Sequence, residues 1–255
     1  MNSKNDFIAV FDSGVGGVSV LRHLRRVLPE ERFLYFGDSA NAPYGTRPTA
    51  EIRALTLAAA EKLMARGIKA LVVACNTATA AAIKDLRALY PHMVIIGIEP
   101  ALKVAADHFP GCTVGVMATP ATLREEKFAD LMARFDGLCH TIKLPAPGLV
   151  ELVEQGRADG PEAEALLEEL LGGYRGKLDA LVLGCTHYPF LEKGIRKVLG
   201  PEVVLLDGGD GTARETRRRL AEADLLSAGP GSVIFENSSL DPAMTTLCQK
   251  LLEQS

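Results

Sequence analysis

The chain has 255 residues, of which 47% are hydrophobic and 24% charged, and its formal net charge at pH 7 is -4. This composition is typical of a globular protein with a full core, and no apolar run approaches the roughly 18 residues that indicate a membrane span. The five scattered cysteines argue against a disulfide framework or a structural metal site, and the basic residues form no dense stripe. Because Met1–Asp6 also lacks a secretory pattern, we expect a reduced, cytoplasmic protein that acts on a small molecule and contacts neither membrane nor nucleic acid.

Short aliphatic runs alternate with longer helical patterns along the chain. The predicted strands are 7–11, 32–36, 70–74, 93–97, 113–117, 180–184, 203–206 and 232–235. The predicted helices are about 17–28, 50–66, 77–89, 120–134, 162–175, 189–199, 211–225 and 239–253. Continuous apolar strands bounded by helices are typical of parallel strands covered on both faces. We therefore predict an α/β fold with doubly wound, mainly parallel sheets, in which a ligand binds beyond the carboxyl ends of the strands.

Two segments of the chain resemble one another. Ala70–Thr77 and Ala180–His187 are identical at four of their first six positions, and each carries a cysteine one small residue after an aliphatic run. This repeat predicts two pseudo-symmetric halves with a site between them. Pro and Gly interrupt the pattern at Gly97–Pro100 and Asp207–Asp210, which we interpret as crossings between the halves. The predicted domains are 1–98 together with 208–255, and 99–207.

A glycine-rich segment, Phe11–Gly17, joins the first predicted strand to a helix. Glycines permit a sharp turn and expose backbone N–H groups, and a helix N-terminus favours an anion. Neither a dinucleotide fingerprint nor a P-loop fits, because Ser19 occupies the third glycine position and no Gly-Lys-Ser/Thr follows. Asp12 would repel a phosphate and attract an ammonium group. The segment is therefore predicted to bind a ligand, with a purely structural turn as the alternative; the same two readings stay open for the turn around Tyr44.

Cys75 and Cys185 each lie between a predicted strand and a predicted helix. A helix N-terminus stabilises a thiolate, so we expect the pKa of both thiols to be lowered. His187 follows Cys185 closely enough to exchange a proton with it, and nearby side chains offer donors for a carboxylate; these are Asn76, Thr77 and Thr186. The remaining cysteines are interpreted as buried, inert side chains; they are Cys112, Cys139 and Cys248.

Two matched cysteines suit racemisation. The reaction removes a proton from one face of a carbon and delivers a proton to the other face, which requires two acid/base groups on opposite walls. One group must begin as a thiolate and the other as a thiol. Positioned proton transfer contributes roughly 10²–10⁴-fold to the rate, and holding the carbon between the two groups adds to this.

Four motifs, found together and in order, resemble those of the glutamate racemases within the aspartate/glutamate racemase superfamily. They are Phe11–Gly17, Pro43–Gly45, Ala74–Thr77 and Gly184–His187, and the resemblance covers nearly the whole chain. It implies a two-domain fold with the glutamate cleft between the domains. It also implies chemistry without pyridoxal phosphate, metal or nucleotide, and a D-glutamate product that serves peptidoglycan synthesis. We further expect a homodimer.

The resemblance also assigns roles to individual residues. In the family the first cysteine deprotonates D-glutamate and the second deprotonates L-glutamate, so these roles pass to Cys75 and Cys185. Asp12 is implied to assist the first cysteine and His187 the second, and Glu154 is a further catalytic candidate. The implied substrate contacts are Asp12, Ser13, Tyr44, Gly45, Asn76, Thr77, Thr119, Thr186 and His187. The sequence departs from the family pattern at Glu151, where proline is common, and at Ala118, where glycine is usual.

Three alternatives remain at this point. An aspartate racemase or another relative of the same superfamily would use the same two cysteines on a substrate of different length. A two-domain binding protein without catalysis is disfavoured by the paired cysteines and by the absence of a secretory pattern. A phosphate-transferring enzyme is disfavoured because the glycine-rich segment lacks the P-loop lysine.

Overall fold

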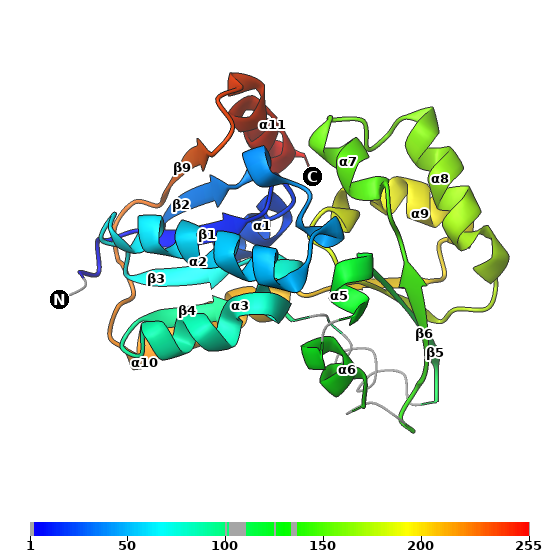
Figure 1. Ribbon diagram of the computed structural model, residues 1–255, viewed down its shortest axis with the longest axis horizontal. Helices are drawn as coiled ribbons and strands as arrows, with labels where there is room; N and C mark the ends of the chain where they lie inside the picture. Colours follow the sequence, from blue (N-terminus) through cyan, green and yellow to red (C-terminus); the bar gives the residue numbers. More distant parts are fainter. Residues whose placement is uncertain (1–2, 100, 102–110, 125, 134–136, 255) are drawn as a thin grey trace.

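A computed structural model describes residues 3–99, 101, 111–124, 126–133 and 137–254 (Figure 1). The strands are β1 (Ile8–Asp12), β2 (Arg32–Gly37), β3 (Ala70–Val73), β4 (Val94–Gly97), β5 (Thr113–Ala118), β6 (His140–Pro145), β7 (Ala180–Leu183), β8 (Val204–Asp207) and β9 (Ser232–Asn237). The α-helices are α1 (Val18–Val27), α2 (Thr49–Met64), α3 (Asn76–Leu89), α5 (Pro120–Arg124), α6 (Glu126–Ala133), α7 (Leu149–Glu154), α8 (Pro161–Leu171), α9 (Glu192–Leu199), α10 (Gly209–Glu222) and α11 (Pro242–Glu253). Short 3-10 turns occupy Ser39–Asn41, Tyr44–Thr46, Gly172–Tyr174 and Tyr188–Leu191.

The first sheet has the strand order β4-β3-β1-β2-β9, and all its pairings are parallel. Alternate residues of β1 enter different cores: Ile8 and Val10 pack with α1, α10 and α11, whereas Ala9 and Phe11 pack with α2 and α3. Because helices cover both faces, every residue of β1 is buried. This double covering explains why the central strands are continuously apolar rather than alternating.

The second sheet has the order β6-β5-β7-β8 and is also parallel throughout. On one face, Val114, Val116 and Val182 pack against side chains from α5 and α6. On the other face, leucines of the sheet join a cluster with α8 and α9 that continues into the core of the first sheet. Figure 1 shows the two sheets in separate halves of the molecule. After β8 the chain leaves the second sheet, forms α10 and returns to the first sheet as β9.

The predicted fold class is confirmed, with two parallel-sheet α/β units. All eight predicted strands are present, with ends moved by only a residue or two, but β6 and α7 were not predicted. The predicted helix 120–134 is found as α5 and α6, and residue 134 lies outside the described residues. Strand β9 pairs with β2, so the C-terminal segment shares a sheet with the N-terminal strands. The domain boundaries stay a prediction, and Pro100 at the first proposed crossing lies outside the described residues.

No helix in the described part of the chain is both long enough and apolar enough to span a membrane. Arg214, Arg217 and Arg218 of α10 are exposed, and Arg218 pairs with Glu215 and Glu222.

Candidate active site

The candidate residues meet where strands of the two sheets end. Asp12 ends β1, Cys75 follows β3, and Cys185 follows β7. Two hydrogen bonds join the halves at this place: Thr186 Oγ1 donates to Asp12 Oδ2 (3.0 Å), and Ser19 Oγ donates to the Thr186 carbonyl oxygen (2.9 Å). The carboxyl ends of the strands therefore face one another, as expected for a ligand site in a parallel α/β fold.

The glycine-rich segment permits close approach between the halves. A Cβ atom on Gly14 would overlap a carboxylate oxygen of Glu154, and one on Gly16 would overlap the ring of His187. The phenol of Tyr35 donates to the Gly14 carbonyl oxygen (2.7 Å) and holds the loop in place. Gly14 and Gly16 thus allow the loop to contact Glu154 and His187 of the second half. This contact explains the glycines without a bound phosphate.

Cys75 lies in a buried, acidic setting. Its sulfur accepts a long hydrogen bond from the Ala78 backbone N–H (3.4 Å) at the start of α3 and contacts Ser13 Oγ (3.5 Å). Burial and, next, the negative charge of Asp12 raise the pKa of the thiol to about 12. The expectation of a lowered pKa is therefore wrong for Cys75, because burial beside a carboxylate outweighs the two hydrogen bonds. The charge of Cys185 also contributes to the increase, so the two sulfur atoms interact across one site.

Cys185 lies beside His187, which forms an ion pair with the carboxylate of Glu154. Its sulfur is 3.6 Å from His187 Nδ1, and His187 Nε2 is 2.6 Å from Glu154 Oε1. Burial alone would lower the pKa of His187, but the interactions with Cys185 and Glu154 raise it well above its ordinary value. Burial likewise opposes ionisation of Glu154, yet His187 and hydrogen bonds from Val15 and Ser39 keep its pKa below the ordinary value. His187 is therefore an imidazolium at neutral pH.

Asp12 is hydrogen-bonded to residues of both halves. It is fully buried and accepts hydrogen bonds from the Gly14 backbone N–H (2.9 Å) and from Thr186 Oγ1. Burial raises the pKa of its carboxyl, and the positive charge of His187 partly offsets this. Because its oxygens are already partnered, Asp12 is held in one orientation toward the site.

The remaining predicted contacts provide polar atoms around the same place. Asn76 Oδ1 is buried and has no hydrogen-bond partner among the described residues. Buried polar atoms are normally hydrogen-bonded, so this oxygen is available to accept a hydrogen bond from a ligand. Thr77 Oγ1 is 3.3 Å from Thr119 Oγ1, so residues of α3 and of the β5 end adjoin one another. A Cβ atom on Gly45 would lie 2.8 Å from Thr119, while the Tyr44 phenol donates to Asp38 Oδ2 (2.6 Å).

Thr122 was not singled out from the sequence. Its hydroxyl is 3.0 Å from the hydroxyls of both Thr77 and Thr119, and only 2% of the residue is exposed. Its position three residues after Thr119, on the first turn of α5, was the available signal. Ser39, whose Oγ contacts Glu154 Oε2 at 3.4 Å, also belongs to the site and followed β2 without a recognisable motif.

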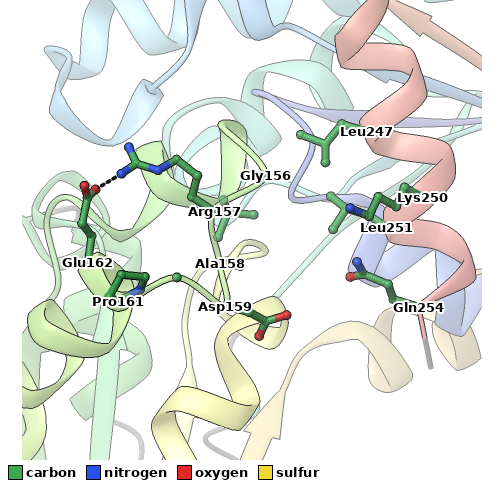
Figure 2. A pocket seen from close by; sticks show the side chains of 12 residues that line it. Gly156, Arg157, Ala158, Asp159, Pro161, Glu162, Leu247, Lys250, Leu251 and Gln254 are labelled. Atoms are coloured by element: carbon green, nitrogen blue, oxygen red, sulfur yellow. Dashed lines mark ion pairs between the residues drawn. The ribbon is translucent and has the colours of Figure 1, made fainter.

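Two hollows flank the cluster. A small one of about 20 Å³ is lined by Gly45, Thr119 and neighbours at the ends of β5 and β6. A larger one of about 230 Å³ lies between α11 and the turn after α7, with Leu247 and Leu251 on one side and the Arg157–Glu162 ion pair on the other (Figure 2). The larger hollow contains neither cysteine, so it is distinct from the candidate site. Among the described residues, no three His, Cys, Asp or Glu side chains gather as a metal site.

Comparison with known proteins agrees with this arrangement. Residues 13–216 match the model of the Asp/Glu/Hydantoin racemase family. The chain belongs to this family. It is also 45% identical over 258 residues to the glutamate racemase of Clostridium botulinum, with both sequences covered completely. The resemblance to glutamate racemases that the four motifs predicted is thereby confirmed.

Solved structures of this racemase family share the fold. The glutamate racemase of Thermus thermophilus, in complex with beta-chloro-D-alanine, superimposes with a TM-score of 0.82 at 39% identity, over 99% of this chain and 95% of that one. The glutamate racemase of Francisella tularensis, in complex with D-glutamate, gives a TM-score of 0.85 at 29% identity with the same coverage.

Proposed function

We propose that the protein interconverts L-glutamate and D-glutamate, with Cys75 and Cys185 as the two acid/base groups. The observation that carries this proposal is the position of two buried cysteines after β3 and β7, at strand ends that the hydrogen bond from Thr186 to Asp12 joins. Relatives named glutamate racemase, at 45% identity over the full chain, support glutamate as the substrate.

In the direction from L- to D-glutamate, the Cys185 thiolate removes the α-proton from one face of the carbon. The Cys75 thiol then delivers its proton to the other face, which leaves Cys185 as a thiol and Cys75 as a thiolate. The reverse direction exchanges these roles. No atom is gained or lost by the enzyme beyond the proton that moves from one sulfur to the other.

The surroundings of the two sulfurs differ in charge. The imidazolium of His187 stabilises negative charge on the adjacent Cys185 sulfur, and Glu154 keeps His187 protonated. The raised pKa of Cys75 keeps its sulfur protonated at neutral pH. A cation therefore lies beside Cys185, whereas the carboxylate of Asp12 lies beside Cys75.

The polar residues of the site bind the substrate and stabilise charge that develops on its α-carboxylate. Asn76 Oδ1 and Asp12 suit the ammonium group, because both are acceptors in a buried setting. Hydroxyl groups suit the two carboxylates, since fixed donors are most effective where water is excluded. These donors are Ser13, Thr77, Thr119 and Thr122, with Tyr44 and Gly45 closing the site near Thr119, while the Thr186 hydroxyl donates to Asp12 and orients it toward the substrate.

We extend the proposal to the cell. The product D-glutamate would serve peptidoglycan synthesis, the protein would act in the cytoplasm, where its thiols stay reduced, and it would form a homodimer. Growth of a D-glutamate-requiring bacterium on the expressed gene tests the first point, and sedimentation of the purified protein tests the last.

Hydrogen exchange in deuterated water tests the reaction itself. We expect the enzyme, without added cofactor, to introduce deuterium at the α-carbon of L- and D-glutamate while the optical rotation decays to zero. Aspartate is the matched control, with one methylene fewer, and should exchange far more slowly. Exchange of aspartate at an equal or higher rate would overturn glutamate as the substrate, and absence of exchange in both would overturn the reaction.

A further inference from the structure

Two cysteines outside the candidate site contact one another. Cys112 Sγ and Cys139 Sγ are 3.1 Å apart, only about 1 Å more than the roughly 2.05 Å of a disulfide bond. The five cysteines are not joined as disulfides in the structure. Both residues are buried, as the sequence predicted. Their contact was not predicted, because they are 27 positions apart in the chain.

The backbone already suits a bond between them. Cys112 precedes β5 and Cys139 precedes β6, and the His140 backbone N–H donates to the Cys112 carbonyl oxygen (2.8 Å). The parallel pairing of Thr113 with His140 therefore continues back to the two cysteines. Neighbouring strands lie about 4.8 Å apart, which is within the 4.4–6.8 Å between Cα atoms that a disulfide requires.

The pair lies far from the racemase chemistry. Cys112 and Thr119 occupy opposite ends of β5, which places them roughly 20 Å apart. Both cysteines are almost covered, at 7% and 8% exposure, but their chain neighbours Gly111 and Leu138 are exposed. The two thiols therefore lie beside exposed residues at one end of β5 and β6, and the proposal requires that a small reagent reach them there.

We propose that Cys112 and Cys139 form a redox-active pair that closes reversibly to a disulfide on reaction with a low-molecular-weight disulfide such as oxidised glutathione. The inference does not depend on the proposed racemase function, because neither residue takes part in it.

The exchange proceeds in two balanced steps. The Cys139 thiolate attacks one sulfur of oxidised glutathione, the bond between the two glutathione sulfurs breaks, and one glutathione thiolate leaves. The Cys112 sulfur then attacks the Cys139 sulfur and expels the second glutathione thiolate. The two protons lost by the cysteines are taken up by the two leaving thiolates, so the protein is oxidised by two electrons and oxidised glutathione is reduced to two glutathione molecules. Because burial, and then Cys139, raise the pKa of Cys112 to about 12, we place Cys112 in the second step.

Closure would fasten the edge strand β6 to β5. The bond would also close a chain segment that contains α5 and α6, and it would reduce the freedom of the unfolded chain. We therefore expect the oxidised protein to melt several degrees above the reduced protein.

The test equilibrates the reduced, folded protein with oxidised glutathione, blocks remaining thiols with N-ethylmaleimide and maps peptides by mass spectrometry without reduction. A peptide pair joined through Cys112 and Cys139, reversed by dithiothreitol, is the expected product. Cys112→Ser and Cys139→Ser are matched controls that should abolish the link and the rise in Tm. Cys248→Ser, which removes another buried cysteine, should leave both unchanged.

The proposal is wrong if both residues remain N-ethylmaleimide-labelled thiols after equilibration, or if the link forms only in denaturant. It is also wrong if glutathione is retained on Cys139 without closure to Cys112, because the geometry then fails to bring the second sulfur into reaction. A link with an unchanged or lower Tm would overturn the stabilising role of closure.

Discussion

Cys75 and Cys185 end equivalent strands of the two sheets, but their electrostatic surroundings differ. Cys75 has a hydroxyl and a carboxylate near it, and the pKa of its thiol is raised to about 12. Cys185 has an imidazolium beside it that Glu154 holds in place. The repeat in the sequence therefore places two similar nucleophiles, while a position at which the segments differ, His187, and residues outside them, Asp12 and Glu154, give each sulfur different neighbouring charges. The two substrates are mirror images, but the two cysteines that act on them have different electrostatic surroundings.

Removal of either sulfur is expected to have the largest effect. Cys75→Ser and Cys185→Ser should each lower racemisation by roughly 10²–10⁴-fold, because a hydroxyl is a poor acid/base group at neutral pH. Polarimetry with either enantiomer measures the loss, and circular dichroism checks that the fold persists. Near-normal turnover in either variant would rule out the two-base scheme.

Loss of the cation beside Cys185 should come next. His187→Asn is expected to lower kcat/KM by about 10–100-fold, the size of one lost charge-assisted hydrogen bond. The decrease must be equal in the two directions, because L- and D-glutamate have the same free energy in solution. Unchanged kinetic constants would mean that the imidazolium does not support the Cys185 thiolate.

Glu154→Gln should act through His187 and shift the pH dependence. The wild-type activity is expected to fall as the pH rises through the raised pKa of His187, and removal of the carboxylate should move this fall to lower pH. The lowered pKa of Glu154 also contributes stability above its ordinary value of 4.5, and this stability is lost as the pH falls through the folded-state pKa. The raised pKa of His187 contributes stability that is present below 6.5 and lost as the pH rises through its folded-state value.

A pH profile of kcat/KM and Tm for wild type and Glu154→Gln checks both effects. We expect the largest difference in Tm at pH values between the folded-state pKa of Glu154 and that of His187, where both groups are charged. Identical alkaline limbs would show that Glu154 does not control the protonation of His187.

The smallest effect is expected at the threonine cluster. Thr122→Val keeps the shape of the side chain but removes a hydroxyl that contacts Thr77 and Thr119. A loss of one neutral hydrogen bond should raise KM by about 2–10-fold with little change in kcat. Steady-state kinetics with glutamate measures this, and an unchanged KM would remove Thr122 from the substrate site.

The sequence predicted most of the fold because buried parallel strands are continuously apolar and easily recognised. Strand β6 was not predicted because it lies at a sheet edge, where polar residues such as His140 and Lys143 interrupt the apolar pattern. Helix α7 was not predicted because it has only six residues and begins after Gly148, which has a φ of 84°. Short elements of this kind carry too little periodicity to be detected.

Some residues of the candidate site were predicted from sequence pattern, and others were not. Strand-end residues such as Cys75 and Cys185 are visible as a pattern, whereas Glu154 came only from the family resemblance. Its contact with His187 spans 33 positions and depends on how α7 packs against the turn Tyr188–Leu191. The direction of the pKa shift at Cys75 was predicted wrongly, because a helix N-terminus is visible in the sequence but burial beside Asp12 is not.

The asymmetry of the two sulfurs is tested most directly by their alkylation rates in the substrate-free enzyme. Cys75 and Cys185 are similarly covered, at 5% and 7% exposure, so a difference in rate reports mainly on ionisation. Brief labelling with iodoacetamide at neutral pH, followed by mass spectrometry, should modify Cys185 well before Cys75, and His187→Asn should reduce this preference. Faster labelling of Cys75 in the wild-type enzyme would contradict the account.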